Sequence, residues 1–349
     1  MVICQKERRE GVESQVRMGE TSVRFLSRKG WVGKAIELRG MIEQEEADLI
    51  HTTIFESDLV GRFAACGMGI PVLTSLVNDS YSRLRLRDPN VNRLKLWGAS
   101  TLDGWTSRHL TTHFHAITRA VKEAAIERLR IPSEKITVIE RGRDPMRLGE
   151  MSIERRHAAR RGLGLKEDSE VLLNVARQEY QKNQALLLHA AADLALQRPS
   201  LKVLIAGRRG NATQDLEREI GRLSLAGRVE LLGHREDVPE LLAAADLFVF
   251  PSLYEGLGGA LIEAMGMGLP IVATRIPAIS EVVEEGENAL LVDPESPNGL
   301  AAAITILLSD PEMRRRFGRR SREIFLDRFT LDKSIRRMTE LYQNLVGTA

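Results

Sequence analysis

Two glutamates eight residues apart, Glu255 and Glu263, lie in the glycine-rich segment PSLYEGLGGALIEAMGMGLPIVAT, which begins at the end of an apolar run. Glu263 is the only charged residue between Leu257 and Thr274. A carboxylate in such surroundings loses hydration and needs hydrogen-bond donors, and the vicinal hydroxyls of a ribose are suitable donors. A buried ion pair with a structural role explains Glu263 equally well. Glu255 stands at a turn where the polar edge of a ligand would lie, although an isolated Glu is more commonly a solvated loop charge.

The residues between the two glutamates form a glycine-rich turn that leads into a predicted helix. Backbone amides in such a turn can approach an anion, and the positive end of the helix favours this. The candidate amides belong to Gly258, Gly259 and Ala260. The glycine spacing differs from the GxGxxG dinucleotide fingerprint, and close packing of the helix on the strand would also explain the glycines.

Two cations, Arg177 and Lys182, lie five residues apart in the segment VARQEYQKN, after another apolar run. At the carboxyl end of a strand they could converge on one diphosphate, with the arginine as a bidentate fork and the lysine as a point charge. Arg177 is the better candidate for a diphosphate ligand, because it follows the strand directly. Lys182 could instead begin a surface helix.

Two further loops carry candidate polar groups at predicted strand ends. Gly207 lies in the segment AGRRG, and Gly233, His234 and Arg235 open the segment GHRED. His234 can donate a hydrogen bond to a base or a phosphate, but a histidine in a loop is more often simply solvated.

Short apolar runs alternate with longer helical patterns along the chain. This alternation indicates βαβ units and parallel sheets, and runs such as LFVF, apolar on both faces, fit sheets that are covered on both sides. Ligands of such sheets bind beyond the carboxyl ends of the strands, which is where the candidate residues lie. The predicted strands are 2–4, 23–26, 48–52, 71–77, 113–118, 136–140, 171–176, 202–206, 229–232, 247–251, 270–274 and 289–292. The predicted helices are 32–46, 58–68, 119–129, 154–161, 183–197, 213–225, 238–245, 259–267, 313–322 and 331–346.

Composition narrows the class of protein. The chain has 349 residues, of which 43% are hydrophobic and 28% charged, with a formal net charge of +2. This length suggests two domains, and the charge lacks the strong basic excess of a dedicated nucleic-acid binder. Cys4 and Cys66 are too few for a disulfide framework and lack the spacing of a metal site. We therefore expect a soluble cytoplasmic chain with no membrane span and no signal peptide.

Two of the predicted helices, 154–161 and 313–322, are rich in arginine. A solvated helix face is the favoured interpretation of both. The minority alternative is contact with an anionic membrane surface, which would place the protein peripherally at the inner membrane face.

Together these segments resemble the retaining GT-B glycosyltransferases of the family 4 type, also described as glycosyl transferases group 1. The signature of that family is E-x7-E after a strand, which here runs from Glu255 to Glu263. The segment FVFPSLYEGLGGALIEAMGMGLPIVATRIPAISEVVEEGENALLVDP follows the family pattern almost throughout, as do VAR…K and LLGHREDVPELLAAAD. The resemblance is strong over residues 170–295 and loose before residue 140. It implies two Rossmann-like α/β domains with parallel sheets and a cleft between them.

The resemblance implies transfer of a hexose-type sugar from a nucleoside-diphosphate sugar to an acceptor hydroxyl, with retention of configuration. Glu263 would hold the ribose hydroxyls, and Glu255 the hydroxyls of the donor sugar near the reacting carbon. Arg177 and Lys182 would neutralise the diphosphate leaving group, where charge develops in the transition state. No metal or other cofactor is implied, because these cations take its place. The donor-side residues are completed by Gly207, Gly233, His234, Arg235, Gly258, Gly259 and Ala260.

The resemblance also implies a division of the chain. An acceptor-side domain would span residues 1–145, a nucleotide-sugar-binding domain 146–330, and a helix that crosses back to the first domain 331–349. The family's first domain opens with a strand, a Gly-Gly loop and a long helix, whereas residues 2–4 here resemble its second strand. We therefore expect the amino-terminal domain to lack roughly one βα unit. A catalytically silent nucleotide-sugar-binding protein is the alternative function that this expectation leaves open.

On the acceptor side, many relatives carry a histidine after the strand predicted at 71–77. This chain has Asn78 there, with Asp79 beside it. Asparagine can donate a hydrogen bond but cannot shuttle a proton, and a simple turn residue is an equally good explanation. The donor base and sugar stay open, as does the acceptor, which could be a glycan, a lipid-linked molecule or a small molecule. Four histidines receive no role: His51, His109, His113 and His115.

Overall fold

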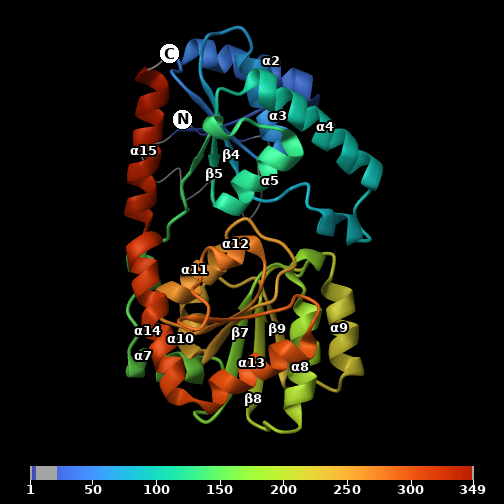
Figure 1. Ribbon diagram of the computed structural model, residues 1–349, viewed down its shortest axis with the longest axis vertical. Helices are drawn as coiled ribbons and strands as arrows, with labels where there is room; N and C mark the ends of the chain where they lie inside the picture. Colours follow the sequence, from blue (N-terminus) through green and yellow to red (C-terminus); the bar gives the residue numbers. More distant parts are fainter. Residues whose placement is uncertain (1, 5–21, 348–349) are drawn as a thin grey trace.

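Parallel strands alternate with helices along the chain, as the sequence predicts. The computed structural model describes residues 2–4 and 22–347. Within these ranges every strand pairing is parallel, and the strands form sheets of two, four and six strands. Figure 1 shows the four-stranded sheet in the upper half of the molecule and the six-stranded sheet in the lower half. These halves, called here the amino-terminal and carboxy-terminal parts, confirm the predicted α/β fold class.

The amino-terminal part is built on the sheet β3-β4-β5-β6. Leu73 and Phe114, on the two central strands, are fully buried. Strands β1 and β2 pair with each other in a sheet of their own, and the expectation of a missing βα unit stays a prediction. The elements are β1 (Val2–Cys4), β2 (Val23–Phe25), α2 (Gly30–Gln44), β3 (Ile50–Thr53), α3 (Phe55–Ala65), β4 (Val72–Leu76), η1 (Arg83–Arg87), α4 (Arg93–Leu110), β5 (His113–Ala116), α5 (Arg119–Leu129), η2 (Ser133–Lys135) and β6 (Ile136–Val138).

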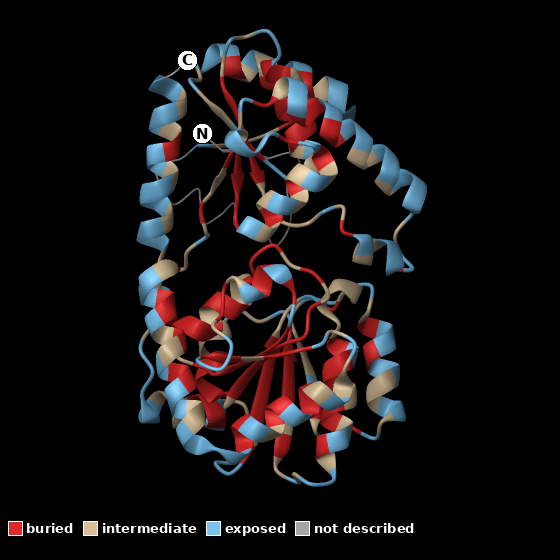
Figure 2. Ribbon diagram, in the orientation of Figure 1, coloured by how far each residue is buried: buried red, intermediate tan, exposed pale blue. Residues whose placement is uncertain are grey.

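The carboxy-terminal part is built on the sheet β12-β11-β10-β7-β8-β9. Every residue of β10 and β11 is buried, as expected for strands covered on both faces (Figure 2). Its elements are α6 (Pro145–Leu148), α7 (Ile153–Gly162), β7 (Glu170–Val175), η3 (Tyr180–Lys182), α8 (Gln184–Ala195), β8 (Leu201–Ala206), α9 (Thr213–Arg222), β9 (Val229–Gly233), α10 (Val238–Ala244), β10 (Leu247–Phe250), α11 (Gly259–Gly266), β11 (Ile271–Thr274), α12 (Pro277–Ser280), β12 (Ala289–Val292), α13 (Pro297–Ser309) and α14 (Pro311–Arg328).

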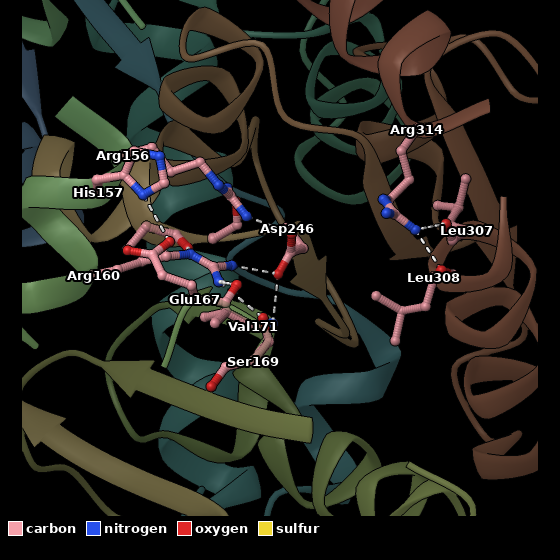
Figure 3. Close-up of polar contacts among 12 residues, drawn as sticks. Arg156, His157, Arg160, Glu167, Ser169, Val171, Asp246, Leu307, Leu308 and Arg314 are labelled. Carbon is pink, nitrogen blue, oxygen red and sulfur yellow. Dashed lines mark hydrogen bonds and ion pairs between the residues drawn. The ribbon is translucent and has the colours of Figure 1, made fainter. Parts of the chain in front are cut away.

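Arginines of α7 tie this helix to the amino ends of β7 and β10, opposite the strand ends that carry the candidate site (Figure 3). The buried guanidinium of Arg160 donates to Asp246 Oδ2 at 2.8 Å, and Arg156 forms an ion pair with Asp246 Oδ1 at 2.6 Å. The same carboxylate accepts a hydrogen bond from the Val171 amide. The predicted solvated face is therefore wrong for these two arginines, because the Asp246 carboxylate draws them onto the sheet.

The last helix carries the chain back from the carboxy-terminal part to the amino-terminal part. Helix α15 (Leu331–Gly347) runs along one side of the molecule, beyond α14, to the upper half (Figure 1). There Leu341 packs with Leu73 and Ile139 of the amino-terminal part. Helix α15 thus packs on the core of the amino-terminal part in this structure.

A chain of hydrogen bonds through two histidines fixes α15 to this sheet. His115 Nε2 lies 2.7 Å from the Ile139 carbonyl, which can only accept, so Nε2 carries the proton and Nδ1 accepts from Ser75 Oγ at 2.8 Å. Ser75 in turn accepts from His51 Nε2 at 2.7 Å, which leaves His51 Nδ1 to accept from the Tyr342 hydroxyl at 2.7 Å. Both rings must be neutral for this pattern, and burial lowers the pKa of His51 to about 4 and also lowers the pKa of His115.

Helix α4 is the main element that sequence patterning misses. Its buried residues are Asp103, Gly104, Thr106 and Ser107, none of which has a large apolar side chain. Helix prediction from periodicity requires apolar residues on the buried face, so a helix buried through polar groups gives no such signal. Helix α13 (Pro297–Ser309) and the short helices α6 and α12 are also absent from the predicted helices. The ends of the elements that were predicted differ from those observed by a few residues.

Candidate active site

The six-stranded sheet has a switch point between β7 and β10. These strands pair side by side, and from there the chain builds β8 and β9 on one side and β11 and β12 on the other. Such a reversal leaves a crevice beyond the carboxyl ends of the two strands, where ligands of open α/β sheets bind. Arg177 and Lys182 follow β7, and Glu255 follows β10, so the fold places these three residues around the switch point.

The structure brings Glu255 and Lys182 into contact. Lys182 Nζ lies 2.5 Å from Glu255 Oε1, and Ser252 Oγ donates to the same oxygen at 2.7 Å. The Glu255 side chain is only 8% exposed, so the alternative of a solvated loop charge is wrong. The Lys182 ammonium is also largely buried, which rules out a surface lysine at a helix start. A buried ion pair of this kind is costly unless further polar groups complete it, which is typical of a functional site.

Arg177 pairs with a different carboxylate from Lys182 in this structure. Its side chain is 61% exposed, and its Nη1 forms an ion pair with Glu179 Oε1 at 2.7 Å within the same loop. Binding of one diphosphate by both Arg177 and Lys182 therefore stays a prediction. It requires Arg177 to break its ion pair with Glu179 and to bind the diphosphate instead.

Glu263 forms an ion pair, which Sequence analysis gives as the alternative to a ribose contact for this residue. Arg143 Nε donates to Glu263 Oε1 at 2.6 Å, and both side chains are half-buried. Arg143 comes from the segment that joins the two parts and packs over the start of α11, where a Cβ on Gly259 would collide with its guanidinium. Sequence reasoning gave Arg143 no role. The ribose contact of Glu263 stays a prediction.

The start of α11 presents backbone amides near the switch point. Gly258 caps this helix with a left-handed φ of +81°, a conformation that favours glycine. The first helical bond there is donated by Ile262 to the Gly258 carbonyl, so the amides of Gly259 and Ala260 have no partner within the helix. The glycine turn thus has the geometry of an anion-binding helix start.

The two other predicted loops also lie at this edge of the sheet. The Gly207 amide donates to the Gly233 carbonyl at 2.7 Å, and a Cβ on Gly207 would collide with the Ala176 carbonyl after β7. Arg235 forms a salt bridge with Asp237, while His234 is exposed. The two loops follow β8 and β9, and their contacts with a donor stay predictions.

The loop of Glu255 packs directly against the amino-terminal part. Thr118 Oγ1 donates to the Gly256 carbonyl at 2.9 Å. A Cβ on Gly256 would collide with the Val77 carbonyl and would lie 2.9 Å from Ile117 Cδ1. The backbone between β4 and Asn78 therefore touches the backbone beside Glu255, and the two parts meet at the candidate site.

Asn78 and Asp79 line a cavity of about 60 Å³ in the amino-terminal part. Asp79 forms an ion pair with Arg128 at 2.9 Å, and burial raises the pKa of Asp79. The Oδ1 atoms of Asn78 and of Asp58, which also lines the cavity, are buried without hydrogen-bond partners. Because a buried acceptor is costly to leave unpaired, this cavity is suited to a donor-rich group such as a hydroxyl. The acceptor role of Asn78 and Asp79 stays a prediction.

Asp58 should make stability depend on pH. Burial raises its pKa to about 7, whereas an unfolded Asp titrates near 4. The folded state therefore binds more protons between these values, and the stability associated with this carboxyl is lost as the pH rises through 7. We expect the advantage of Asp58→Asn over the parent protein in free energy of unfolding to grow from pH 5 to pH 8, by about 1.4 kcal/mol for each pH unit up to the folded pKa. Urea unfolding at both pH values measures this, with the exposed Asp168→Asn as control. A difference that stays constant with pH contradicts the expected titration of Asp58.

The described residues contain no evident metal or membrane-spanning feature. Within residues 2–4 and 22–347, no group of three or more His, Cys, Asp or Glu side chains could hold a metal ion. No helix in the same ranges is long and apolar enough to cross a membrane.

Two family models match the chain, and their ranges together span most of it. Residues 155–324 match the model described as glycosyl transferases group 1, and residues 3–142 match the glycosyl transferase 4-like domain. The chain belongs to the GT-B glycosyltransferases of the family 4 type.

Two curated relatives show how far this glycosyltransferase resembles known members. It is 26% identical over 314 residues to the UDP-Gal:alpha-D-GlcNAc-diphosphoundecaprenol alpha-1,3-galactosyltransferase of Escherichia coli, covering 89% of this chain and 79% of that one. It is 29% identical over 265 residues to the alpha-D-kanosaminyltransferase of Streptomyces kanamyceticus, covering 69% and 68%.

A solved structure confirms the fold of the glycosyltransferase. Anabaena Alr3699/HepE in complex with UDP-glucose superposes with a TM-score of 0.85 at 23% identity, covering 95% of this chain and 88% of that one.

Proposed function

We propose that this glycosyltransferase moves a hexose from a nucleoside-diphosphate sugar to an acceptor hydroxyl with retention of configuration. The observation that carries the proposal is the buried Lys182–Glu255 pair at the switch point between β7 and β10. A UDP-sugar is the first donor to test. The E. coli relative is named for UDP-Gal, and the Anabaena protein was solved with UDP-glucose.

The leaving group would be stabilised by charges that the fold has already placed. Negative charge develops on the departing diphosphate, and preorganised donors lower the energy of that state. Lys182 supplies a fixed cation, and the free amides of Gly259 and Ala260 add the positive end of α11. Arg177, exposed at the rim, can add a second cation once a diphosphate competes with Glu179.

The two glutamates would orient the donor. Glu255 uses Oε1 for Lys182 and Ser252, which leaves Oε2 to accept from a sugar hydroxyl near the reacting carbon. Glu263 uses Oε1 for Arg143, so its second oxygen can accept from a ribose hydroxyl. Carboxylate charge near the sugar also assists an oxocarbenium-like transition state.

Retention would follow from attack on the face that the leaving group departs from. In that route the acceptor oxygen bonds to the anomeric carbon as the carbon–phosphate oxygen bond breaks. The departing phosphate takes the acceptor's proton, so no nucleophile from the protein is needed. The cations of the protein would do the work that a metal ion does elsewhere, and no resident cofactor is required.

The test is product analysis by proton NMR with α-linked UDP-sugars and a panel of hydroxyl acceptors. We expect UDP and an α-configured product, with a rate that a metal chelator leaves unchanged. A β-configured product contradicts retention, and loss of activity on chelation contradicts metal independence. Thermal stabilisation by UDP without any product would instead support the silent nucleotide-sugar binder.

A further inference from the structure

Helix α4 turns its apolar side chains to solvent. Leu94, Trp97 and Trp105 are 76%, 67% and 48% exposed, and Leu102 is exposed beside them. Their spacing places them on one side of the helix. We call these four residues the α4 face. Figure 1 shows α4 at the outer side of the amino-terminal part, and Figure 2 shows how much of it is open to solvent.

Polar contacts on the opposite side hold the helix in this orientation. Arg62, itself fully buried, donates to Asp103 Oδ1 at 2.7 Å and to Thr106 Oγ1 at 2.8 Å. Tyr81 donates its hydroxyl to Asp103 Oδ2 at 2.8 Å. Rotation of α4 to bury the tryptophans would leave the Arg62 charge unpaired in the core, which is strongly unfavourable. The outward apolar face is therefore built into the fold.

The exposed charges within the segment that carries the α4 face, residues 83–110, are positive. Between residues 83 and 110 the acidic residues are Asp88 and Asp103, and both are buried. Arg87 forms an ion pair with Glu295 of the carboxy-terminal part. The exposed cations of this stretch are Arg83, Arg87, Arg93, Lys95 and Arg108.

We propose that the α4 face docks on the surface of an anionic lipid bilayer. Tryptophan and leucine insert at the boundary of headgroups and acyl chains, while flanking Arg and Lys side chains meet lipid phosphates. Two copies of the chain packed through this face would bring like charges together, which disfavours a self-interface. Asp103 lines the acceptor-side cavity from the same helix, so docking holds that cavity close to the lipid headgroups.

Vesicle co-sedimentation of the full chain tests the proposal. We compare vesicles of phosphatidylcholine alone with vesicles that contain phosphatidylglycerol, at low salt and at about 0.5 M salt, where charge attraction is screened within a few ångströms. We expect binding to the anionic vesicles, about tenfold or more weaker at high salt because screening removes the charge attraction. The double variant Trp97→Gln/Trp105→Gln should lose binding at least tenfold, and Arg93→Gln/Lys95→Gln should weaken it on anionic vesicles.

The matched control is Leu196→Gln, which removes an exposed apolar side chain from the carboxy-terminal part and should bind like the parent protein. Thermal melts of each variant check folding. The proposal is overturned if the parent protein does not bind anionic vesicles at low salt. It is overturned as well if the folded Trp97→Gln/Trp105→Gln variant binds these vesicles as tightly as the parent protein. It is also overturned if the parent is a dimer that the double variant turns into a monomer, because the face would then be a self-interface.

Discussion

Replacing Lys182 with methionine is expected to lower the rate of sugar transfer at least about 100-fold. The side chain is the buried cation at the switch point, and removal of one preorganised group that stabilises transition-state charge typically costs two to three orders of magnitude. Steady-state release of nucleoside diphosphate measures the effect. The exposed Lys166→Met is the matched control and should retain the parent rate.

A loss of activity in that variant could also come from damage to the fold, since Glu255 would be left buried without its cation. The double variant Lys182→Met/Glu255→Gln separates the two causes. Its melting temperature should recover towards that of the parent protein, because neither side chain is then charged, while its transfer rate should stay low. Activity within about threefold of the parent in a folded Lys182→Met variant contradicts the assigned role.

Gly256→Ala is the second substitution with a large expected effect. An added Cβ collides with the Val77 carbonyl of the amino-terminal part, and backbone cannot move aside as a flexible side chain can. The two parts must then separate at the loop that carries Glu255, which also strains the hydrogen bond from Thr118 to the Gly256 carbonyl. We expect kcat/KM to fall at least about tenfold, since small misplacements of catalytic groups are costly.

The control for this substitution is Gly221→Ala in α9, where a Cβ meets no atom within 4 Å. It should keep full activity and add a little stability, as alanine favours a helix over glycine. Steady-state kinetics and thermal melts of both variants measure the contrast. Parent-like kinetics in Gly256→Ala would show that the observed contact between the two parts does not exist during catalysis.

Much of the fold could be predicted because buried parallel strands have a strong local pattern. β12 (Ala289–Val292) and α5 (Arg119–Leu129) lie at their predicted bounds. Glu255 and Lys182 could each be singled out because both follow such a strand. Their mutual contact spans 73 residues of sequence and depends on the pairing of β7 with β10, which no local pattern reports.

The rest of the site depends on contacts that only the folded chain defines. Arg143 reaches Glu263 across 120 residues because the segment joining the two parts packs over α11. Gly256 is one glycine among several in the sequence, and only its approach to Val77 places it between the two parts. Helix α4 is not predicted because its polar side faces the core. Helix prediction from periodicity relies on apolar residues on the buried side, and α4 has them on the exposed side.

The most direct test of the catalytic role of the Lys182–Glu255 pair is release of nucleoside diphosphate from a panel of nucleotide sugars. We predict that the parent protein consumes at least one donor, with UDP-sugars tested first, and that an acceptor hydroxyl raises the rate. Glu255→Gln and Lys182→Met should each lower this release at least about 100-fold, with thermal melts to check that the variants are folded. If UDP raises the melting temperature of the parent protein but no donor is consumed with any acceptor, the catalytic assignment of the Lys182–Glu255 pair is contradicted.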